Sequence, residues 1–192
     1  VVAKELMVKK LLLLLVLHLS LTAFGQLGGR ATYQFLNLVS SPKQAALGGK
    51  VLTDQSYDPA SGLFNPASIN LNMDNQLSLN YVNYLADVNY GTVSYAYEYD
   101  RRIQVIHAGV TYVNYGTFQG FDERGNATSD FSGGEVAFSV GYAYNIPRTD
   151  FFIGANAKLI SSKLEEYTSL GGAVDLGFLY VIAVWRSILR YD

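Results

Sequence analysis

The residues best suited to chemistry are few and widely spaced in this sequence. Ser40-Ser41-Pro42-Lys43 matches the S-x-x-K pattern of penicillin-recognising serine enzymes, in which the lysine lies one helical turn after the nucleophile. That mechanism also needs a K-T-G strand, and no K-T-G occurs anywhere in the chain. The sequence therefore predicts no catalytic residues and no enzyme.

Metal ligands are equally scarce. Cys is absent, and His18 lies in a segment that we expect to be removed, which leaves His107 as the single histidine. His107 has no second ligand at helical or hairpin spacing. The acidic run at residues 122–126 lacks the alternating oxygen ligands of a calcium-binding loop. We expect no metal site and no cofactor, and a solvated loop at 122–126.

The elements that position these residues are predicted to be strands. Between residues 91 and 159, bulky apolar or aromatic residues occupy every second position, with small or polar residues between them, as in Val93-Ser94-Tyr95-Ala96-Tyr97. A period of two indicates a strand with one apolar face. Bulk on one face and Gly, Ser, Ala and charge on the other is typical of outer-membrane strands, with lipid outside and a crowded lumen inside. We therefore predict an all-β, antiparallel up-and-down outer-membrane β-barrel.

Six strands are expected, and they are not enough to close a barrel. Short turns are predicted at 100–102 and 147–150, and longer, cell-surface loops at 115–134 and 162–170. The smallest outer-membrane barrels have about eight strands, and the alternation stops after Tyr180. We therefore expect the strands at 76–180 to form an incomplete barrel, followed by an aberrant tail at 181–192. The predicted strands are 76–83, 89–99, 103 to about 114, 135–145, 151–161 and 171–180.

The start of the chain resembles an export signal. Lys9 and Lys10 precede an apolar run at 11–21, and Ala23-Phe24-Gly25 offers small residues before a cleavage point. We predict that residues 1–25 are a Sec-type signal peptide with a spurious extension at 1–6, and that the protein reaches the outer membrane of a Gram-negative bacterium. Residues 26–75, rich in Gly, Ser, Asn and Pro, are expected to pack in or under the barrel as a plug-like segment.

The charge distribution argues against nucleic-acid binding. Removing residues 1–25, which hold three Lys and one Glu, leaves 11 basic and 15 acidic residues, whereas a nucleic-acid binder carries clustered positive charge. Four polar residues are expected to form a lumen network, since buried charges need partners. Glycines on the same face leave room for an occupant, which is the N-terminal segment, a small ligand or water. The lumen residues are Glu98, His107, Lys158 and Asp175, and the glycines are Gly109, Gly141, Gly154 and Gly177.

Several strings in the chain resemble a known family. Gly48-Gly49, a following Asp54 or Asp58, and Asn65-Pro66-Ala67 look like the A-x-G-G … D … N-P-A signature of FadL-type outer-membrane barrels. With the strings at 28–38, 80–84 and 141–147, residues 28–180 resemble PorQ-like barrel components of the type IX secretion system. The resemblance implies an outer-membrane component of the surface attachment machinery, which holds a partner protein at the cell surface.

The expected partners are outer-membrane lipid and a surface-exposed protein. Aromatic residues are common interface anchors, and five lie in the predicted surface loops, although Tyr115 and Phe131 fit an aromatic girdle equally well. Two alternatives stay open: a FadL-like transporter of hydrophobic molecules, and a secreted soluble β-sandwich adhesin. The predicted partner contacts are Tyr115, Phe118, Phe121, Phe131 and Tyr167.

Overall fold

The computed structural model describes residues 32–100 and 103–181, and the chain divides into two units between Thr32 and Tyr33. The predicted signal peptide, the tail from residue 182 and residues 101–102 of the first predicted turn lie outside the described residues. The described helices and strands belong to the second unit. None of its helices combines the length and the apolar character that a membrane crossing needs.

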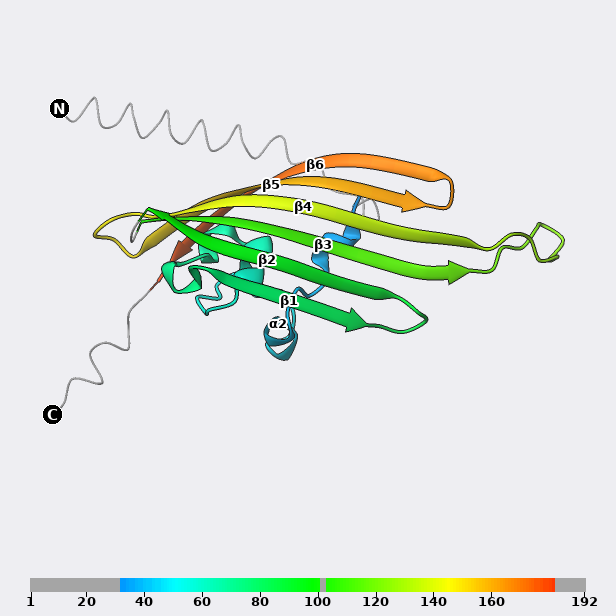
Figure 1. The fold of residues 1–192 in the computed structure, drawn as a ribbon, viewed down its shortest axis with the longest axis horizontal. Helices are drawn as coiled ribbons and strands as arrows, with labels where there is room; N and C mark the ends of the chain where they lie inside the picture. Colours follow the sequence, from blue (N-terminus) through cyan, green and yellow to red (C-terminus); the bar gives the residue numbers. More distant parts are fainter. Residues whose placement is uncertain (1–31, 101–102, 182–192) are drawn as a thin grey trace, which may run out of the picture. The chain divides into compact units, whose positions relative to one another are not determined.

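Six antiparallel strands form one sheet, in which each strand pairs with its neighbours in the sequence (Figure 1). The sheet is open, with β1 and β6 as its edges. The predicted all-β class and the six antiparallel strands are confirmed. The strands are β1 (Gln76–Asn83), β2 (Asn89–Asp100), β3 (Gln104–Phe118), β4 (Phe131–Asn145), β5 (Phe151–Leu164) and β6 (Tyr167–Tyr180).

The predicted loop at 162–170 is wrong. The β5–β6 ladder continues to the pair Leu164↔Tyr167, so that only Glu165 and Glu166 form the turn, with Glu165 at a φ of 56°. The hydrophobic alternation fades in this stretch, but backbone hydrogen bonds do not depend on side-chain polarity. The hairpin therefore extends beyond the end of its apolar pattern.

The connection between β3 and β4 is also shorter than predicted. β3 continues through a bulge between Asn114 and Thr117, where Gly116 has a φ of 76°, and the loop covers residues 119–130. Connections at this end of the sheet, which we call the loop end, are therefore 84–88, 119–130 and 165–166. The predicted rule of long loops at one end and short turns at the other fails for β5–β6.

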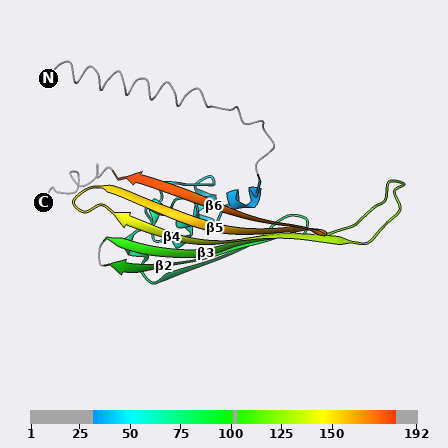
Figure 2. The same ribbon diagram turned by 90° about the horizontal axis from the view of Figure 1, so that it is seen from above.

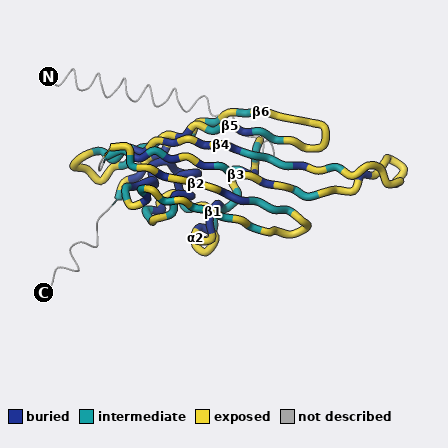
Figure 3. Tube along the Cα trace, viewed as in Figure 1, coloured by how far each residue is buried: buried dark blue, intermediate teal, exposed yellow. Residues whose placement is uncertain are grey.

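The two faces of the sheet differ in the way the alternation predicts (Figure 3). On β2, Val93, Tyr95 and Tyr97 are exposed on what we call the outer face, while Ser94 and Ala96 are buried on the covered face. The same alternation runs through β3 and β4, as Figure 3 shows. Bulk therefore points outward and small residues point toward the covering segment.

Residues 33–75 form a series of short helices that lie against the covered face (Figure 2). Asx or Ser side chains cap four of the five helices, all except η1. Proline follows the cap in three cases, because its fixed φ and missing N–H suit the first helical position. Asp58, for example, accepts from the Ala60 N–H at 3.0 Å before Pro59. The helices are η1 (Gln34–Asn37), α2 (Pro42–Ala46), η2 (Pro59–Leu63), η3 (Pro66–Ser68) and η4 (Leu71–Met73).

Two small apolar clusters join this segment to the strands. In the first, Ile69 and Met73 pack against Ala96, Val105 and Ala143. In the second, Phe35 packs against three strand residues, Val113, Ala137 and Ile160. Burial of apolar surface in these clusters favours docking of the segment by roughly 25 cal/mol per Å².

The glycines of the covered face provide the space in which the segment sits. Gly154 and Gly177 are cross-strand partners on β5 and β6. A Cβ on Gly154 would lie 2.6 Å from the carbonyl carbon of Pro66, and one on Gly177 would overlap Asn65 Oδ1. Gly109 faces Leu63 in the same way, with its Cβ position 2.7 Å from Cδ2. The occupant that the sequence left open is therefore the N-terminal segment at these three positions.

We predict that Gly154→Ala separates Asn65-Pro66-Ala67 from the sheet. The added methyl group meets backbone, which cannot rotate away, so we expect a destabilisation of ~1–3 kcal/mol, in the range of overpacked cores. Denaturant unfolding measures the loss. Gly172→Ala is the matched control, since its Cβ would lie 3.7 Å from the nearest atom. Equal stability of the two variants would contradict the proposed packing of Asn65-Pro66-Ala67 on Gly154.

Candidate functional site

Polar residues form a row across the covered face. His107 on β3 pairs with Gly141 on β4, Gly141 pairs with Asn156 on β5, and Asn156 pairs with Asp175 on β6. Lys158 lies two residues from Asn156 and therefore on the same face. Three of the four predicted lumen residues thus lie within one band of the sheet, below the N-terminal segment.

Lys158 and Asn156 bind the backbone of that segment directly. Lys158 Nζ lies 2.6 Å from Asp175 Oδ2 and donates to the Leu63 carbonyl at 2.8 Å. The Lys158 side chain is only 9% exposed, so its charge depends on these partners. Asn156 Nδ2 donates to the Gly62 carbonyl at 2.7 Å. Strand β5 therefore binds two successive carbonyls of η2, and the role of this cluster is structural.

Sequence reasoning missed Asn156. It lies on the covered face at 1% exposure, and its side chain fills the space beside Gly141. The alternation along β5 places Asn156 on the same face as Lys158, so its orientation was predictable. Its partner was not, because Gly62 lies 94 residues away in the sequence.

The other two predicted network residues do not join the Lys158–Asp175 ion pair. His107 is 1% exposed and lies under η2, where a Cβ on Gly62 would be 3.3 Å from its ring. The backbone of Pro59 interacts with the ring, but neither ring nitrogen makes a hydrogen bond of ordinary geometry. Glu98 is tied to the segment through its backbone N–H, which donates to Asp74 Oδ1 at 2.7 Å. Lys158 and Asp175 thus form an ion pair, and His107 and Glu98 each lie against the N-terminal segment.

No group of three or more metal-ligating side chains occurs within residues 32–100 and 103–181. In the acidic loop, Asp122 Oδ1 accepts from the N–H groups of Arg124 and Asn126, both at 2.8 Å. Hydrogen bonds from Asn126 and Arg124 lower the pKa of Asp122. The carboxylate of Asp122 therefore stabilises the turn of its own loop.

The S-x-x-K residues hold α2 in place. Ser40 Oγ donates to the Ala60 carbonyl at 3.2 Å, and Ser41 Oγ accepts from the Gln44 N–H at the helix start. Lys43 Nζ lies 2.8 Å from Asp54 Oδ1. Burial of Asp54 would raise its pKa, but hydrogen bonds from Lys43 and Ser56 outweigh this effect and lower the pKa. The lysine amine is thus bound by a carboxylate.

The residues of the resembled signature have clear structural roles. Gly48 and Gly49 have φ angles of 92° and 121° and end α2, where the Gly49 N–H donates to the Gln44 carbonyl at 2.8 Å. This left-handed conformation favours glycine. Asn65 caps η3 through the Ala67 N–H at 3.0 Å and donates to the Leu52 carbonyl at 2.6 Å. The N-P-A string is the part of the segment that sits on Gly154 and Gly177.

Most of the predicted partner contacts do not lie in loops. Tyr115 and Phe118 belong to β3, Phe131 belongs to β4 and Tyr167 begins β6, because the strands extend beyond their apolar pattern. Phe118 and Phe131 stack across β3 and β4 with ring centroids 5.3 Å apart. The Tyr115 hydroxyl donates to Glu135 Oε2, and its ring packs with the second apolar cluster. Tyr115 therefore supports the covered face.

Phe121 is the one predicted contact that lies in a loop. It forms an isolated bridge with Ala127, and the turn between them is closed by Asp122. Its side chain is 62% exposed. An aromatic ring on a hydrogen-bonded tip loses little conformational freedom on binding, which suits it to contact a partner.

The outer face is apolar over the middle of the sheet and polar at the loop end. One cross-strand row near that end is polar on every strand, except for one glycine. On β3, the outward residues between Gln104 and Asn114 are Ile106, Ala108, Val110 and Tyr112. The polar row is Asn83, Asn89, Asn114, Gly134, Lys163 and Thr168.

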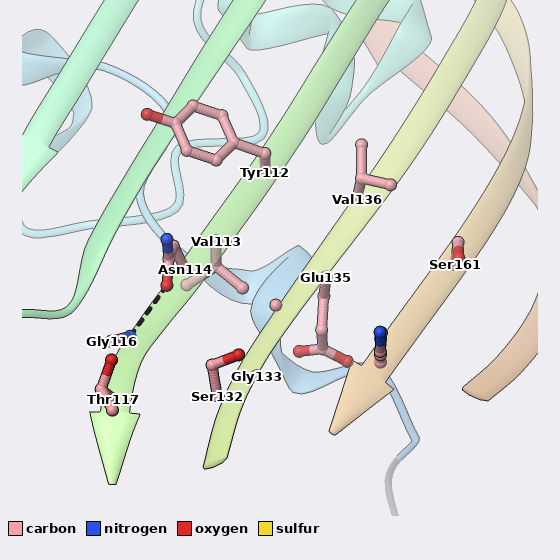
Figure 4. Close-up of a pocket in the computed structure, with 12 residues that line it drawn as sticks. Tyr112, Val113, Asn114, Gly116, Thr117, Ser132, Gly133, Glu135, Val136 and Ser161 are labelled. Carbon is pink, nitrogen blue, oxygen red and sulfur yellow. Dashed lines mark hydrogen bonds between the residues drawn. The ribbon is translucent and has the colours of Figure 1, made fainter. Parts of the chain in front are cut away.

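The described part of the chain has cavities along its strands. A shallow hollow of about 540 Å³ lies over β3, β4 and β5 at the loop end, and its lining includes Tyr112, Asn114 and Lys163 (Figure 4). A smaller cavity of about 190 Å³ lies between the start of α2 and strands β1 and β2, lined by Pro42 and Tyr90 among others. Neither cavity contains a cluster of catalytic side chains.

A scan of the chain against protein-family models gave no match, and searches of the curated proteins and of the solved structures gave none either.

We predict that Lys158→Met weakens the attachment of the N-terminal segment. The change leaves the Asp175 carboxylate without its cation, and Asp175 is 31% exposed. We therefore expect a loss of about 2–3 kcal/mol, less than the ~3–5 kcal/mol for a fully buried pair. Proteolysis of residues 33–75 and denaturant unfolding measure it. Lys158→Met with Asp175→Asn should recover part of the loss, and no recovery would argue against the ion pair as the cause.

Proposed function

We propose that this chain forms part of the wall of an outer-membrane β-barrel. Its proposed role is non-enzymatic: it is a PorQ-like component of the type IX secretion and attachment machinery that holds a surface partner protein. The observation that carries the membrane proposal is the inverted sheet, with bulky apolar and aromatic residues on the exposed outer face and small or polar residues on the covered face. A signal peptide at 1–25 would direct this export.

The height of the apolar band fits a bilayer. On β3 it lies between Gln104 and Asn114, ten residues apart, or ~33 Å along the strand at roughly 3.3 Å per residue. A strand tilt of about 40° reduces this to ~25 Å along the membrane normal, which is the height of the apolar band of outer-membrane barrels. Tyr81 and Tyr112 lie in the row next to the polar row, where an aromatic girdle is expected.

The sheet has two open edges, at β1 and β6. In lipid, unpaired N–H and C=O groups cost several kcal/mol each, so strand edges do not face hydrocarbon. The edges of β1 and β6 therefore require further strands, supplied by more of this protein or by another chain. The same edges in a soluble protein would need covering against aggregation.

The alternatives are weaker. A soluble β-sandwich adhesin buries its bulky face, whereas Phe138, Val140 and Leu159 are all exposed here, and a patch of this size is unusual on a soluble monomer. A FadL-like transporter needs a path past the covered face, which residues 33–75 occupy. The space that remains between Leu63 and Lys158 is a cavity of about 10 Å³. The filled face favours a scaffold.

Val140→Arg should block membrane insertion. Val140 lies in the middle of the outer face and is 61% exposed, and arginine near the bilayer midplane costs ~2–4 kcal/mol. Asn114→Arg, in the polar row, is the control and should insert normally. The measurement is the fraction of protein that resists alkaline extraction from membranes. If both variants behave like the unmodified protein, or if it stays monodisperse without detergent, the membrane proposal is wrong.

Phe121→Ala should weaken retention of the surface partner about tenfold, the effect of losing one aromatic anchor at an interface. Co-purification from detergent-solubilised outer membranes, with the stoichiometry of the retained protein quantified, measures this change. Phe151→Ala, which removes an exposed ring at the opposite end of the sheet, is the matched control and should retain the partner. Equal loss in both variants would count against Phe121 as the contact.

A further inference from the structure

The hollow at the loop end lies on the outer face, at the level where the apolar band ends. Its lining includes residues of two successive cross-strand rows (Figure 4). Tyr112, Val136 and Ser161 form the row nearer the middle of the sheet, and Asn114, Gly134 and Lys163 form the polar row beyond it. The hollow is therefore amphipathic along the strand direction.

Gly134 makes the hollow possible. It lies between Asn114 and Lys163 in the register, and a Cβ built on it would meet only the Val113 carbonyl, at 3.1 Å. The backbones of β3 and β5 on either side are about 10 Å apart, two inter-strand spacings. That gap admits a group of phosphate size between an amide donor and an ammonium donor.

The donors around the gap are available to a ligand. Lys163 is exposed and forms no ion pair with any residue that the structure describes. Thr117 and Ser132, on the loop side of Gly134, are cross-strand partners that add two hydroxyl groups. The only acid in the lining, Glu135, accepts a hydrogen bond from Tyr115. The hollow thus presents one cation and neutral donors.

We infer that this hollow binds the anionic headgroup of an outer-leaflet lipid, an inference that rests on the proposed membrane function. The phosphate lies at Gly134 and pairs with Lys163, with Ser132 and Asn114 donating hydrogen bonds. The glycerol or sugar and the first acyl carbons lie against Tyr112 and Val136. This orientation matches that of a lipid in the leaflet, with its charge toward the water and its chains toward the midplane.

Native mass spectrometry of the detergent-purified protein tests the site, with phosphatidylglycerol and phosphatidylcholine of identical acyl chains as probes. We expect phosphatidylglycerol to be retained roughly five- to tenfold better, as one partly exposed charge-assisted contact allows. Lys163→Gln should remove that preference. Arg148→Gln, which deletes an exposed cation from the β4–β5 turn, should leave it intact. Gly134→Val should also remove the preference while Lys163 remains, by filling the hollow.

Three results would overturn the inference. They are equal retention of the two lipids, equal loss of preference in Lys163→Gln and Arg148→Gln, and displacement of the lipid by inorganic phosphate at equal concentration, which would indicate a free-anion site. A protein that resists alkaline extraction but lacks the preference refutes the headgroup site alone. A protein that needs no detergent refutes the membrane proposal as well.

Discussion

The structure depends on one packing constraint: the backbone of the N-terminal segment comes closest to the sheet where the strands carry glycine. Asn65-Pro66-Ala67 sits on Gly154 and Gly177, and Leu63 sits on Gly109. The Lys158 and Asn156 bonds to Leu63 and Gly62 are possible because the backbone of η2 comes this close. Because side chains alternate between the two faces of a strand, the bulky residues lie on the face opposite the small ones. The apolar outer surface and the filled inner surface are therefore two results of a single pattern.

Much of the fold could be predicted from the period-two pattern, and the errors have a common cause. The alternation from Val93 to Leu159 gave the strands, their faces and the position of Lys158 correctly. It failed at 162–170 and 115–118, where the ladder continues through Ser, Thr and Lys. Side-chain polarity does not indicate where backbone hydrogen bonding stops, so the strands predicted from the pattern end too early. Tyr115 and Phe131 were assigned to loops for the same reason.

The candidate site was less predictable than the fold. The pairing of Lys158 with Asp175 follows from opposite charges on neighbouring strands of one face. The contacts of Lys158 to Leu63 and of Asn156 to Gly62 join positions more than 90 residues apart, and no local pattern encodes them. Phe121 was named correctly as a loop residue, but the rigid tip that presents it depends on Asp122 accepting from its own turn. The hollow at Gly134 appears only when the register of three strands is known.

The distance along the chain between the segment and its seat has a consequence for biogenesis. Residues 33–75 are synthesised before the strands, yet the glycine pair that contacts them, Gly154 and Gly177, lies on β5 and β6. Their short helices have local caps but no apolar core of their own. This segment can therefore reach its native position only after all six strands have been made, and until then the glycines of the covered face have no cover.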